Sequence, residues 1–402
     1  MKFHRNLSEA VVAALQQIFF EQRYADKALE QILQSNKRWG ARDRAFIAET
    51  TYDIVRWWRM LSEVTGKAPA SEADVWAILG AWLHLEGHEL PAWSEFEALN
   101  LAAIDKKRSQ ISHNPAVEES VPDWLYELGQ QEVGERWNKE LHALNLQAEV
   151  VLRVNTIKTT RDQLQKQLDA EGYETLALRE YPDALQLVQR QNVFKSAAFK
   201  EGMFEVQDAN SQLVAAYMDV KPGMRVIDAC AGAGGKTLHI AALMENKGKI
   251  IAMDTEAWKL SNLKQRARRA GVSSIEPRVI ESQKTIKRLA ASADRLLLDV
   301  PCSGMGVLKR NPDSKWKLSA DFISSIQVTQ QEILQKYSKM LKPDGVMVYS
   351  TCSILPSENR KQVDAFLASE AGKDFTLLKD DNLMPAISGY DGFYMAQLKR
   401  KA

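Results

Sequence analysis

The chain has 402 residues, of which 45% are hydrophobic and 26% are charged, and its formal net charge is +1. This length predicts two or three domains, and the composition is that of a folded chain rather than a disordered one. The N-terminal stretch to Gln22 has apolar residues at helical spacing with Glu9 among them, which predicts an amphipathic helix rather than a signal peptide. No apolar run reaches the roughly 20 residues that cross a bilayer. We therefore expect a cytoplasmic protein with no membrane partner.

The chain has three cysteines, Cys230, Cys302 and Cys352, and their pattern favours neither a disulfide framework nor a metal site. Their number is odd, no CxxC motif is present, and only His239 lies in the same half of the chain. Each cysteine instead lies beside an apolar run, in "MRVIDACAGAGGKT", "RLLLDVPCSG" and "GVMVYSTCS". We therefore expect no metal, and thiols placed where buried strands end.

Residues 1–146 have apolar positions three and four residues apart in most segments, which predicts an all-helical first domain. Eight of the ten tryptophans lie in this part of the chain. Aromatic residues at helical spacing usually form a core, so we favour a core role for them over stacking on bases.

A second pattern begins near Val150, and a third begins at Lys221. Residues 147–220 predict a small α+β segment with a strand, a Thr-capped helix and two further short strands. Residues 221–402 alternate strands with helices, including a long helix from Leu318 to Leu341, which predicts a parallel sheet with helices on both faces. Ligands of such α/β sheets bind at the carboxyl ends of the strands, where the three cysteines fall.

The stretch "DACAGAGGKT", from Asp228 to Thr237, follows a strand and opens a helix. A P-loop would need glycine at Cys230, and a dinucleotide fingerprint would need one at Thr237, so neither pattern fits. The loop resembles the acidic-x-Gly-x-Gly-x-Gly loop of S-adenosylmethionine-dependent methyltransferases, with Cys230 in the first glycine place. Asp254 ends the next strand, where a carboxylate can accept hydrogen bonds from ribose hydroxyls.

The two other cysteines lie in "LDVPCSGMGVLKRNPDSKW" and "YSTCSILPSENRKQV". Together these motifs resemble the paired signatures of the RNA cytosine-5 methyltransferases, the Sun/nucleolar-protein group that includes the bacterial ribosomal RNA enzyme. The stretches "LRVNTIKTTRDQL", "FEVQDANSQLVAAYM" and "DGFYMAQL" are also similar, so the resemblance covers about Pro122 to Leu398. Residues 1–146 are similar, more loosely, to the NusB-like domain of the bacterial member, notably at "RDRAFIAETTYDIVRWWR".

The resemblance implies an α/β protein with a Rossmann-like class I methyltransferase domain and a mainly parallel sheet at 221–402. It also implies a small α+β subdomain at 147–220 and a helical NusB-like RNA-binding or accessory domain at 1–146. The implied activity is S-adenosylmethionine-dependent methylation of RNA at carbon 5 of cytosine. Ribosomal RNA is favoured over transfer RNA, and no DNA partner is expected.

The chemistry of that reaction explains why two cysteines are needed. Carbon 5 of cytosine is a weak nucleophile, and a thiolate that adds to carbon 6 makes it reactive enough to take a methyl group. By resemblance Cys352 is the nucleophile and Cys302 assists release of the product, while Asp299 holds the cytosine edge and Lys236 faces the same pocket. The residues expected to bind the cofactor S-adenosylmethionine are Asp228, Cys230, Ala231, Gly232, Gly234, Gly235, Lys236, Asp254, Glu281 and Asp299.

Two departures from the family pattern stand out. The family usually has Ala-Pro where this chain has Gly232 and Ala233, and an aspartate near the adenine where this chain offers Glu281. Residues Lys259–Arg288 contain nine Lys or Arg and two acids, which suits either an RNA backbone or a solvated helix face.

Several alternatives remain open at this point. Cys230 fits a small buried apolar residue, and Asp254 fits a helix cap. A non-catalytic RNA-binding factor is the second hypothesis for function, and a DNA cytosine methyltransferase with a Pro-Cys nucleophile is the third. The sequence identifies neither the modified cytosine nor the oligomeric state.

Overall fold

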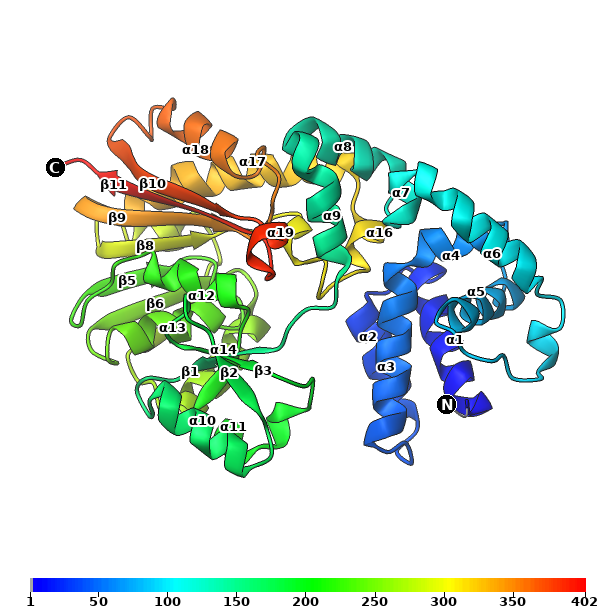
Figure 1. The fold of residues 1–402 in the computed structure, drawn as a ribbon. Helices are drawn as coiled ribbons and strands as arrows, with labels where there is room; N and C mark the ends of the chain where they lie inside the picture. The colour runs from blue at the N-terminus through cyan, green and yellow to red at the C-terminus, as the bar shows by residue number, and fades with distance from the viewer. Residues whose placement is uncertain (1–2) are drawn as a thin grey trace. The chain divides into compact units, whose positions relative to one another are not determined.

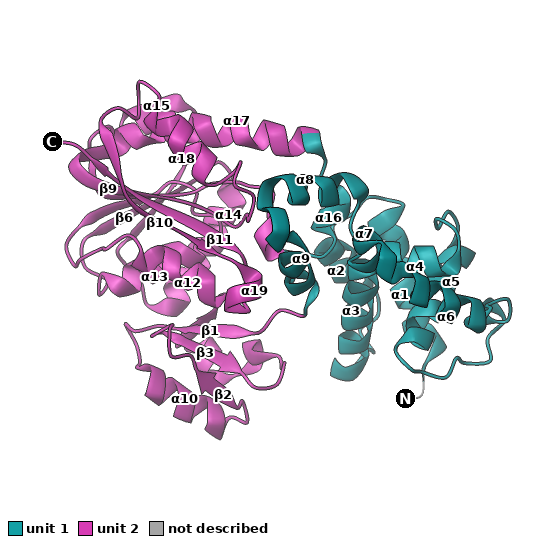
Figure 2. Cartoon of the chain, turned by 45° about the horizontal axis from the view of Figure 1, so that its top comes forward, with its two compact units in different colours: residues 1–146, 308–320 teal, residues 147–307, 321–402 magenta. Residues whose placement is uncertain are grey.

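The computed structural model describes residues 3–402, which form two compact units. The first contains residues 3–146 and 308–320, and the second contains residues 147–307 and 321–402 (Figure 2). Among the residues described, no helix is both long and apolar enough to span a membrane.

The first unit is helical, as the sequence predicts (Figure 1). Its α-helices are α1 (Arg5–Phe19), α2 (Ala25–Ser35), α3 (Ala41–Arg56), α4 (Trp58–Thr65), α5 (Glu72–Leu85), α6 (Leu101–Gln110), α7 (Pro115–Glu118), α8 (Asp123–Val133), α9 (Trp137–Asn145) and α16 (Ser314–Lys317). Local sequence sets some of their starts: Ser71 caps α5, where its side chain accepts a hydrogen bond from the Asp74 amide. Trp58 and Trp76 are buried in the core of this unit, so the expectation that its tryptophans are core residues holds for them.

Residues 308–320 belong to this helical unit although they follow Cys302 in the sequence. Lys315 is 1% exposed, and its Nζ donates hydrogen bonds to the Arg56 carbonyl and to Asn145 Oδ1. The Trp316 indole N–H donates to the Val55 carbonyl. The sequence analysis had assigned this segment to the methyltransferase domain, because its anchoring partners lie more than 150 residues away in the chain.

The second unit begins with a small antiparallel sheet of order β2-β3-β1-β4. Its strands are β1 (Val151–Val154), β2 (Thr175–Ala177), β3 (Ala184–Leu187) and β4 (Phe204–Val206). Helices α10 (Arg161–Ala170) and α11 (Ala197–Lys200) accompany them. Thr160 caps α10 in a capping box with Gln163, as the Thr-capped helix of the sequence analysis requires. Leu152, Leu164 and Phe204 are buried in a core that this segment forms for itself.

The main sheet has seven strands in the order β10-β11-β9-β8-β5-β6-β7. The strands are β5 (Arg225–Asp228), β6 (Lys249–Asp254), β7 (Ile275–Val279), β8 (Ala293–Asp299), β9 (Leu341–Thr351), β10 (Phe375–Leu383) and β11 (Phe393–Arg400). The helices of this part are α12 (Ala209–Ala216), α13 (Gly235–Leu243), α14 (Ala257–Ala270), α15 (Gln283–Lys287), α17 (Ala320–Tyr337), α18 (Arg360–Leu367) and α19 (Pro385–Ser388).

Both faces of this sheet are buried at its central strands β5, β8 and β9, and residues along each strand alternate between the two faces. Val226 and Leu297 pack with helices α12 and α13 on one face. Ile227 and Leu296 pack with α17 and α18 on the other, and Figure 1 shows these helices on opposite sides of the strands. Because helices cover both faces of these strands, the strands have the continuous apolar runs from which the sequence predicts a parallel sheet.

Strands β5 to β9 are parallel, but β10 and β11 are antiparallel to their neighbours. The expectation of a parallel sheet is therefore wrong for this edge. Only residues 384–392 join β10 to β11, which is shorter than the dozen or more residues that a parallel crossover needs. As a result the 384–392 loop lies at the carboxyl end of β9, beside Cys352.

Candidate active site

The loop from Asp228 to Gly235 joins β5 to α13 in a tight turn. Gly232 and Gly234 have φ angles of +54° and +88°, a region that favours glycine. At Gly234 a Cβ atom would also lie 2.6 Å from Leu263 Cγ. These two glycines therefore let the chain turn sharply and bring α13 against α14.

The Asp254 carboxylate lies at the carboxyl end of β6 and is 9% exposed. Its Oδ2 accepts a hydrogen bond from the Gly232 amide at 2.9 Å, and its Oδ1 accepts one from the Glu256 amide at 2.9 Å. Asp254 thus holds the glycine loop and also the backbone just before α14, but it does not cap α14, because it accepts no hydrogen bond from an amide of that helix, all of which the structure describes. Each carboxylate oxygen has a second lone pair, so these bonds leave acceptor capacity for a ligand.

A cavity of about 830 Å³ opens beside this loop. Five of the residues predicted to bind a cofactor line it: Cys230, Gly232, Asp254, Glu281 and Asp299. Apolar side chains of Ile280, Ile286 and Ile333, together with Tyr337, form another part of its wall. An apolar pocket with a few polar groups and a volume in this range is typical of small-molecule sites. The other five predicted residues, Asp228, Ala231, Gly234, Gly235 and Lys236, are not part of the cavity lining.

Asp228 lies behind the glycine loop rather than in the cavity. It is 1% exposed, and its Oδ2 accepts a hydrogen bond from the Thr237 hydroxyl at 2.7 Å. Burial raises the pKa of Asp228 to about 7, and the Thr237 hydrogen bond offsets only part of that increase. The structure therefore gives Asp228 a role in joining β5 to α13.

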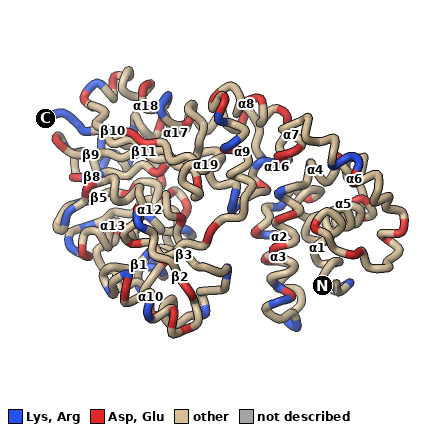
Figure 3. The backbone as a smooth tube through the Cα atoms, in the orientation of Figure 1, with Lys and Arg blue, Asp and Glu red and all other residues tan. Residues whose placement is uncertain are grey.

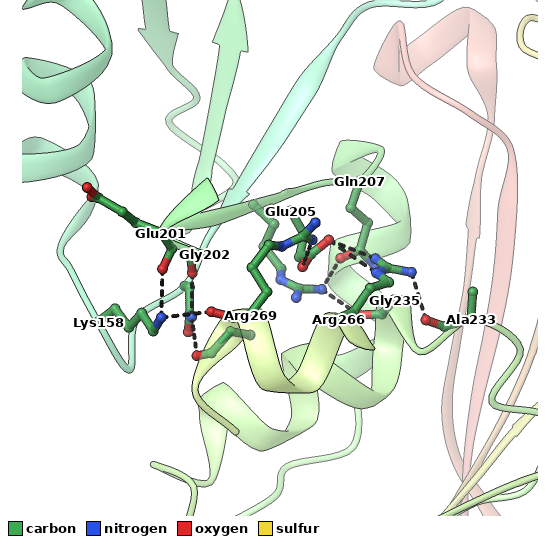
Figure 4. A network of polar contacts seen from close by, with 12 residues as sticks. Lys158, Glu201, Gly202, Glu205, Gln207, Ala233, Gly235, Arg266 and Arg269 are labelled. Carbon is green, nitrogen blue, oxygen red and sulfur yellow. Dashed lines mark hydrogen bonds and ion pairs between the residues drawn. The ribbon is translucent and has the colours of Figure 1, made fainter. Parts of the chain in front are cut away.

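A buried ionic network braces the same loop from the small sheet (Figure 4). Glu205 on β4 accepts hydrogen bonds from Arg266 and Arg269, which lie on α14. Arg266 Nη1 also donates to the Ala233 carbonyl at 2.8 Å, and Arg153 on β1 donates to the Gly235 carbonyl. Two loop carbonyls are thus held by guanidinium groups that the 147–220 segment positions.

This network corrects one interpretation of the basic run. The guanidinium groups of Arg266 and Arg269 face Glu205, so the prediction that the run as a whole faces RNA is wrong for these two residues. Glu205 lies more than 60 positions away in the sequence, which hides the pairing from a sequence reading. Lys264 and Arg268 on the same helix are exposed. Figure 3 likewise shows Lys and Arg interspersed with Asp and Glu along both units.

Lys236 and Asp299 form an ion pair at the carboxyl ends of the strands. Lys236 Nζ lies 2.8 Å from Asp299 Oδ2 and 5.0 Å from the centre of the Phe393 ring. Burial lowers the pKa of Lys236, but the charge of Asp299 and its hydrogen bond outweigh that effect, so the net shift is upward. Lys236 is therefore a cation, and its partner Asp299 lines the cavity.

Cys302 and Cys352 come together although 50 residues separate them in the sequence: their sulfur atoms are 3.2 Å apart. Cys302 follows β8 and Cys352 follows β9, and these strands are parallel neighbours. The hydrogen bond to Cys352 and burial raise the pKa of the Cys302 thiol. Cys230 lines the cavity instead, where burial raises the pKa of its thiol. Two thiols in contact at one sheet edge are an arrangement suited to covalent chemistry on one ligand.

The sequence analysis missed the residues that support this pair. The Gly306 amide donates to the Cys352 carbonyl at 2.8 Å, and the Gly392 amide donates to the Gly306 carbonyl at 2.7 Å. A Cβ at Gly306 would lie 2.2 Å from the Gly392 carbonyl oxygen, so glycine is needed for this close approach. Gly306 belongs to the Pro-Cys motif, but its partner Gly392 lies on the unpredicted antiparallel edge.

Comparisons with known proteins agree with this geometry. Residues 215–399 match the family described as 16S rRNA methyltransferase RsmB/F, and residues 121–194 match the ferredoxin-like domain described for RsmF/B-like methyltransferases. Ribosomal RNA small subunit methyltransferase B of Pseudomonas syringae pv. tomato is 30% identical over 401 residues, covering 89% of each chain. The crystal structure of PH0851 superimposes over 100% of both chains with a TM-score of 0.83 at 24% identity. NSun6 from Pyrococcus horikoshii, solved with SFG, covers 70% of this chain and 98% of its own with a TM-score of 0.64 at 22% identity.

The sheet, the glycine loop and the two solved structures define a Rossmann-like fold of the kind found in methyltransferases. The coverage and identity of the Pseudomonas relative, together with the family match, identify the family as well as the fold. The chain belongs to the RsmB/F family of ribosomal RNA small subunit methyltransferases.

The ionic brace leads to a prediction about stability. Replacing Glu205 with Gln leaves Arg266 and Arg269 without their anionic partner, so we expect the free energy of unfolding to fall by about 2–3 kcal/mol. This expected decrease is smaller than the decrease for breaking a fully buried ion pair, because the two arginine side chains are 25% and 23% exposed. Urea titration of the full chain measures the change. The exposed Glu201→Gln is the control, expected within about 0.5 kcal/mol of the parent; equal effects of the two changes would contradict the brace.

The pKa of Asp228 leads to a prediction about pH. A carboxyl group with a pKa of about 7 in the folded chain and about 3.9 in the unfolded chain binds more protons when folded, so stability falls as pH rises between these values. Asp228→Asn removes that loss while keeping an acceptor for Thr237. We expect the stability of this variant relative to the parent to grow by roughly 2–3 kcal/mol between pH 5 and pH 8.

Thermal or urea unfolding at several pH values tests this expectation. Asp294→Asn is the control, because the pKa of Asp294 is lowered: hydrogen bonds from Lys342 and the Arg225 amide outweigh the upward effect of burial. Its contribution is already complete at pH 5, so its effect stays constant from pH 5 to pH 8. A constant effect of Asp228→Asn as well would show that Asp228 titrates normally.

Proposed function

We propose that the chain transfers a methyl group from S-adenosylmethionine to carbon 5 of a cytosine in ribosomal RNA. The observation that carries this proposal is the pair of thiols 3.2 Å apart, next to the Lys236–Asp299 ion pair. Membership of a ribosomal RNA methyltransferase family supports the substrate class. We assign catalysis to residues 221–307 and 321–402, and RNA binding or an accessory role to the helical unit of 1–146 and 308–320. We assign residues 147–220 to a subdomain that braces the cofactor loop.

The cavity beside the glycine loop fits S-adenosylmethionine in size and chemistry. Asp254 would accept the ribose hydroxyls, the turn at Gly232 would admit the amino-acid part, and Ile280 and Ile286 would pack against the adenine. Glu281 also lines the cavity, in the region where the family usually has an aspartate. SFG, an analogue of S-adenosylmethionine, is present in the NSun6 structure, which supports this assignment. When bound, the cofactor supplies an electrophilic methyl group.

Catalysis begins with the thiolate of Cys352. Its sulfur forms a bond to carbon 6 of the cytosine, and the electron pair of the 5,6 double bond becomes available at carbon 5, which takes the methyl group. Lys236 supplies positive charge near Cys352: the charge of Asp299 and, to a smaller extent, that of Cys352 raise the pKa of Lys236. In general a nearby cation favours a reactive thiolate. Asp299 orients the Lys236 ammonium and would accept a hydrogen bond from the cytosine edge.

Release of the product needs a base near carbon 5. The proton leaves carbon 5, its electron pair re-forms the double bond, and the bond from carbon 6 to the Cys352 sulfur breaks. We assign this assistance to Cys302, whose sulfur lies against that of Cys352. Cys302 would act here as a thiolate that has given its proton to solvent, and it would take the carbon-5 proton to become a thiol.

We expect Asp254→Asn to weaken binding of S-adenosylmethionine. The change removes a charged acceptor for the ribose, which costs about 1.5–3 kcal/mol, or roughly a 10- to 100-fold increase in Kd. Calorimetry without RNA measures this. Glu256→Gln is the control, since Glu256 is an exposed acid two residues away and should bind the cofactor like the parent. An unchanged Kd for Asp254→Asn would limit Asp254 to its hydrogen bonds with the Gly232 and Glu256 amides.

The two cysteines should give opposite results in an adduct assay. Cys352→Ala cannot form the bond to carbon 6, so we expect no methylation and no crosslink to RNA containing 5-azacytidine. Cys302→Ala should attack normally but release slowly, and so accumulate an RNA adduct that survives denaturing electrophoresis. The double variant should lose that adduct.

The reverse pattern would make Cys302 the nucleophile, as in DNA cytosine methyltransferases. Absence of an adduct and of methylation in the parent, with RNA binding intact, would favour a non-catalytic RNA-binding factor. Ser261→Ala, which changes an exposed serine outside the cavity, is the control and should form and release the adduct like the parent.

A further inference from the structure

A buried carboxylate lies behind the two cysteines. Glu358 precedes α18 and its side chain is fully buried. Its Oε1 accepts hydrogen bonds from the Ser303 amide at 2.8 Å and from Gln330 Nε2 at 3.2 Å. Its Oε2 accepts hydrogen bonds from the hydroxyls of Ser303 and Ser353, both at 2.5 Å. One side chain therefore receives four hydrogen bonds, all from neutral groups.

The two serines that bind Glu358 are sequence neighbours of the two cysteines. Ser303 directly follows Cys302, and Ser353 directly follows Cys352. Glu358 Oε2 thus joins the turn that carries Cys302 to the turn that carries Cys352. The pairing of β8 with β9 ends before these turns, at Asp299 and Ser350. The two serine hydroxyls are also 3.3 Å from each other. Each of the two thiols is therefore one residue away from a serine that Glu358 binds.

The carboxylate is itself held in place. The Tyr349 hydroxyl donates to the backbone carbonyl of Glu358 at 2.6 Å, and Asn359 Nδ2 donates to the Ser353 carbonyl at 2.9 Å. Gln330 on α17 donates both to Glu358 and to the Pro301 carbonyl. Strand β9, helix α17 and the two cysteine turns therefore meet at one anchor.

Glu358 also acts on Cys302 through its charge. Its negative charge is one of the causes that raise the pKa of Cys302, after the Cys352 hydrogen bond and burial. Lys236 provides the opposite charge on the side of Cys352. The charge of Glu358 therefore acts on Cys302 only as a contribution to the raised pKa of Cys302.

We propose that Glu358 is the positioning residue for both cysteines: its carboxylate fixes the Ser303 and Ser353 turns and so holds the sulfur atoms of Cys302 and Cys352 in contact. The importance of this contact for methyl transfer rests on the proposed function, but the contact itself does not. Glu358 touches neither the cavity nor a reacting atom and acts through its hydrogen bonds.

A dithiol reagent tests the contact directly. Phenylarsine oxide binds two close thiols together, forming two arsenic–sulfur bonds and releasing water, and mass spectrometry of the full-length chain detects the bridge. We expect the parent to form the Cys302–Cys352 bridge and Glu358→Ala to form it about 10- to 100-fold more weakly, because the thiols are no longer held together. Glu358→Gln keeps one acceptor oxygen and should give an intermediate result. Glu370→Ala, an exposed acid of the same unit, is the control and should behave like the parent.

A second variant covers the case in which Glu358→Ala does not fold. Ser303→Ala combined with Ser353→Ala removes the two hydroxyl bonds and leaves the carboxylate in place, and it should also weaken the bridge. Parent-like bridging in this double variant and in Glu358→Gln would overturn the proposal, as would a parent chain that forms no bridge.

Kinetics separate this proposal from the proposed function. We expect Glu358→Gln to lower kcat while KM for RNA and the Kd for S-adenosylmethionine stay at parent values. If the parent chain never methylates cytosine but its bridge still depends on Glu358, the proposed function fails and the positioning role stands. If methylation is normal in Glu358→Gln and the bridge is unaffected, the positioning role fails alone.

Discussion

The parallel pairing of β8 with β9 is the constraint on which the site depends. Asp299 pairs with Ser350 in this register, so the two chains leave the sheet side by side and each reaches its cysteine within three residues. Successive side chains of a strand point to opposite faces, so a slip of one residue would exchange the side chains that pack with α12 and α13 for those that pack with α17 and α18. Both faces of the sheet are buried at these central strands, which fixes the register strongly. The hydrophobic core thereby determines where the two thiols meet.

Buried charge around the site has a structural use as well as a chemical one. Glu205 and its arginines hold the carbonyls of the glycine loop, and Glu358 holds the turns that carry the cysteines. Both carboxylates are almost completely buried, and each joins segments that are far apart in the chain. Burying such groups without partners would cost several kcal/mol, so each network fixes one arrangement of its loops. The glycine loop and the two cysteine turns are thus held in place for the same physical reason.

The sequence was most informative for the residues at strand ends and for the glycine turn. The strand-end positions of Asp254, Cys302 and Cys352 could be predicted, because apolar runs mark buried strands and the carboxyl ends of parallel strands share one edge. The glycine turn at Gly232 and Gly234 was readable for a similar reason, since few residues other than glycine adopt its backbone angles. These features depend on a few neighbouring residues.

The features that were not predicted depend on contacts between distant segments. Arg266 looks like part of a basic surface until Glu205 is placed opposite it, and Glu358 is one acid among many until two serine hydroxyls converge on it. The antiparallel edge formed by β10 and β11 was missed because a short connection excludes a crossover only once both strands are known. Asp228 was assigned to the cofactor from its place in a motif, whereas its side chain is turned to Thr237.

The segment 308–320 has a consequence for how the two units are connected. The chain passes from the helical unit to the second unit after Leu146, returns after Val307 and leaves again at Asp321, so three covalent links join the units. A single flexible linker permits free rotation, whereas three attachment points restrict the rotation that any one of them would allow. The middle link begins five residues after Cys302. A force applied to the helical unit therefore has a short covalent route to the turn that carries Cys302.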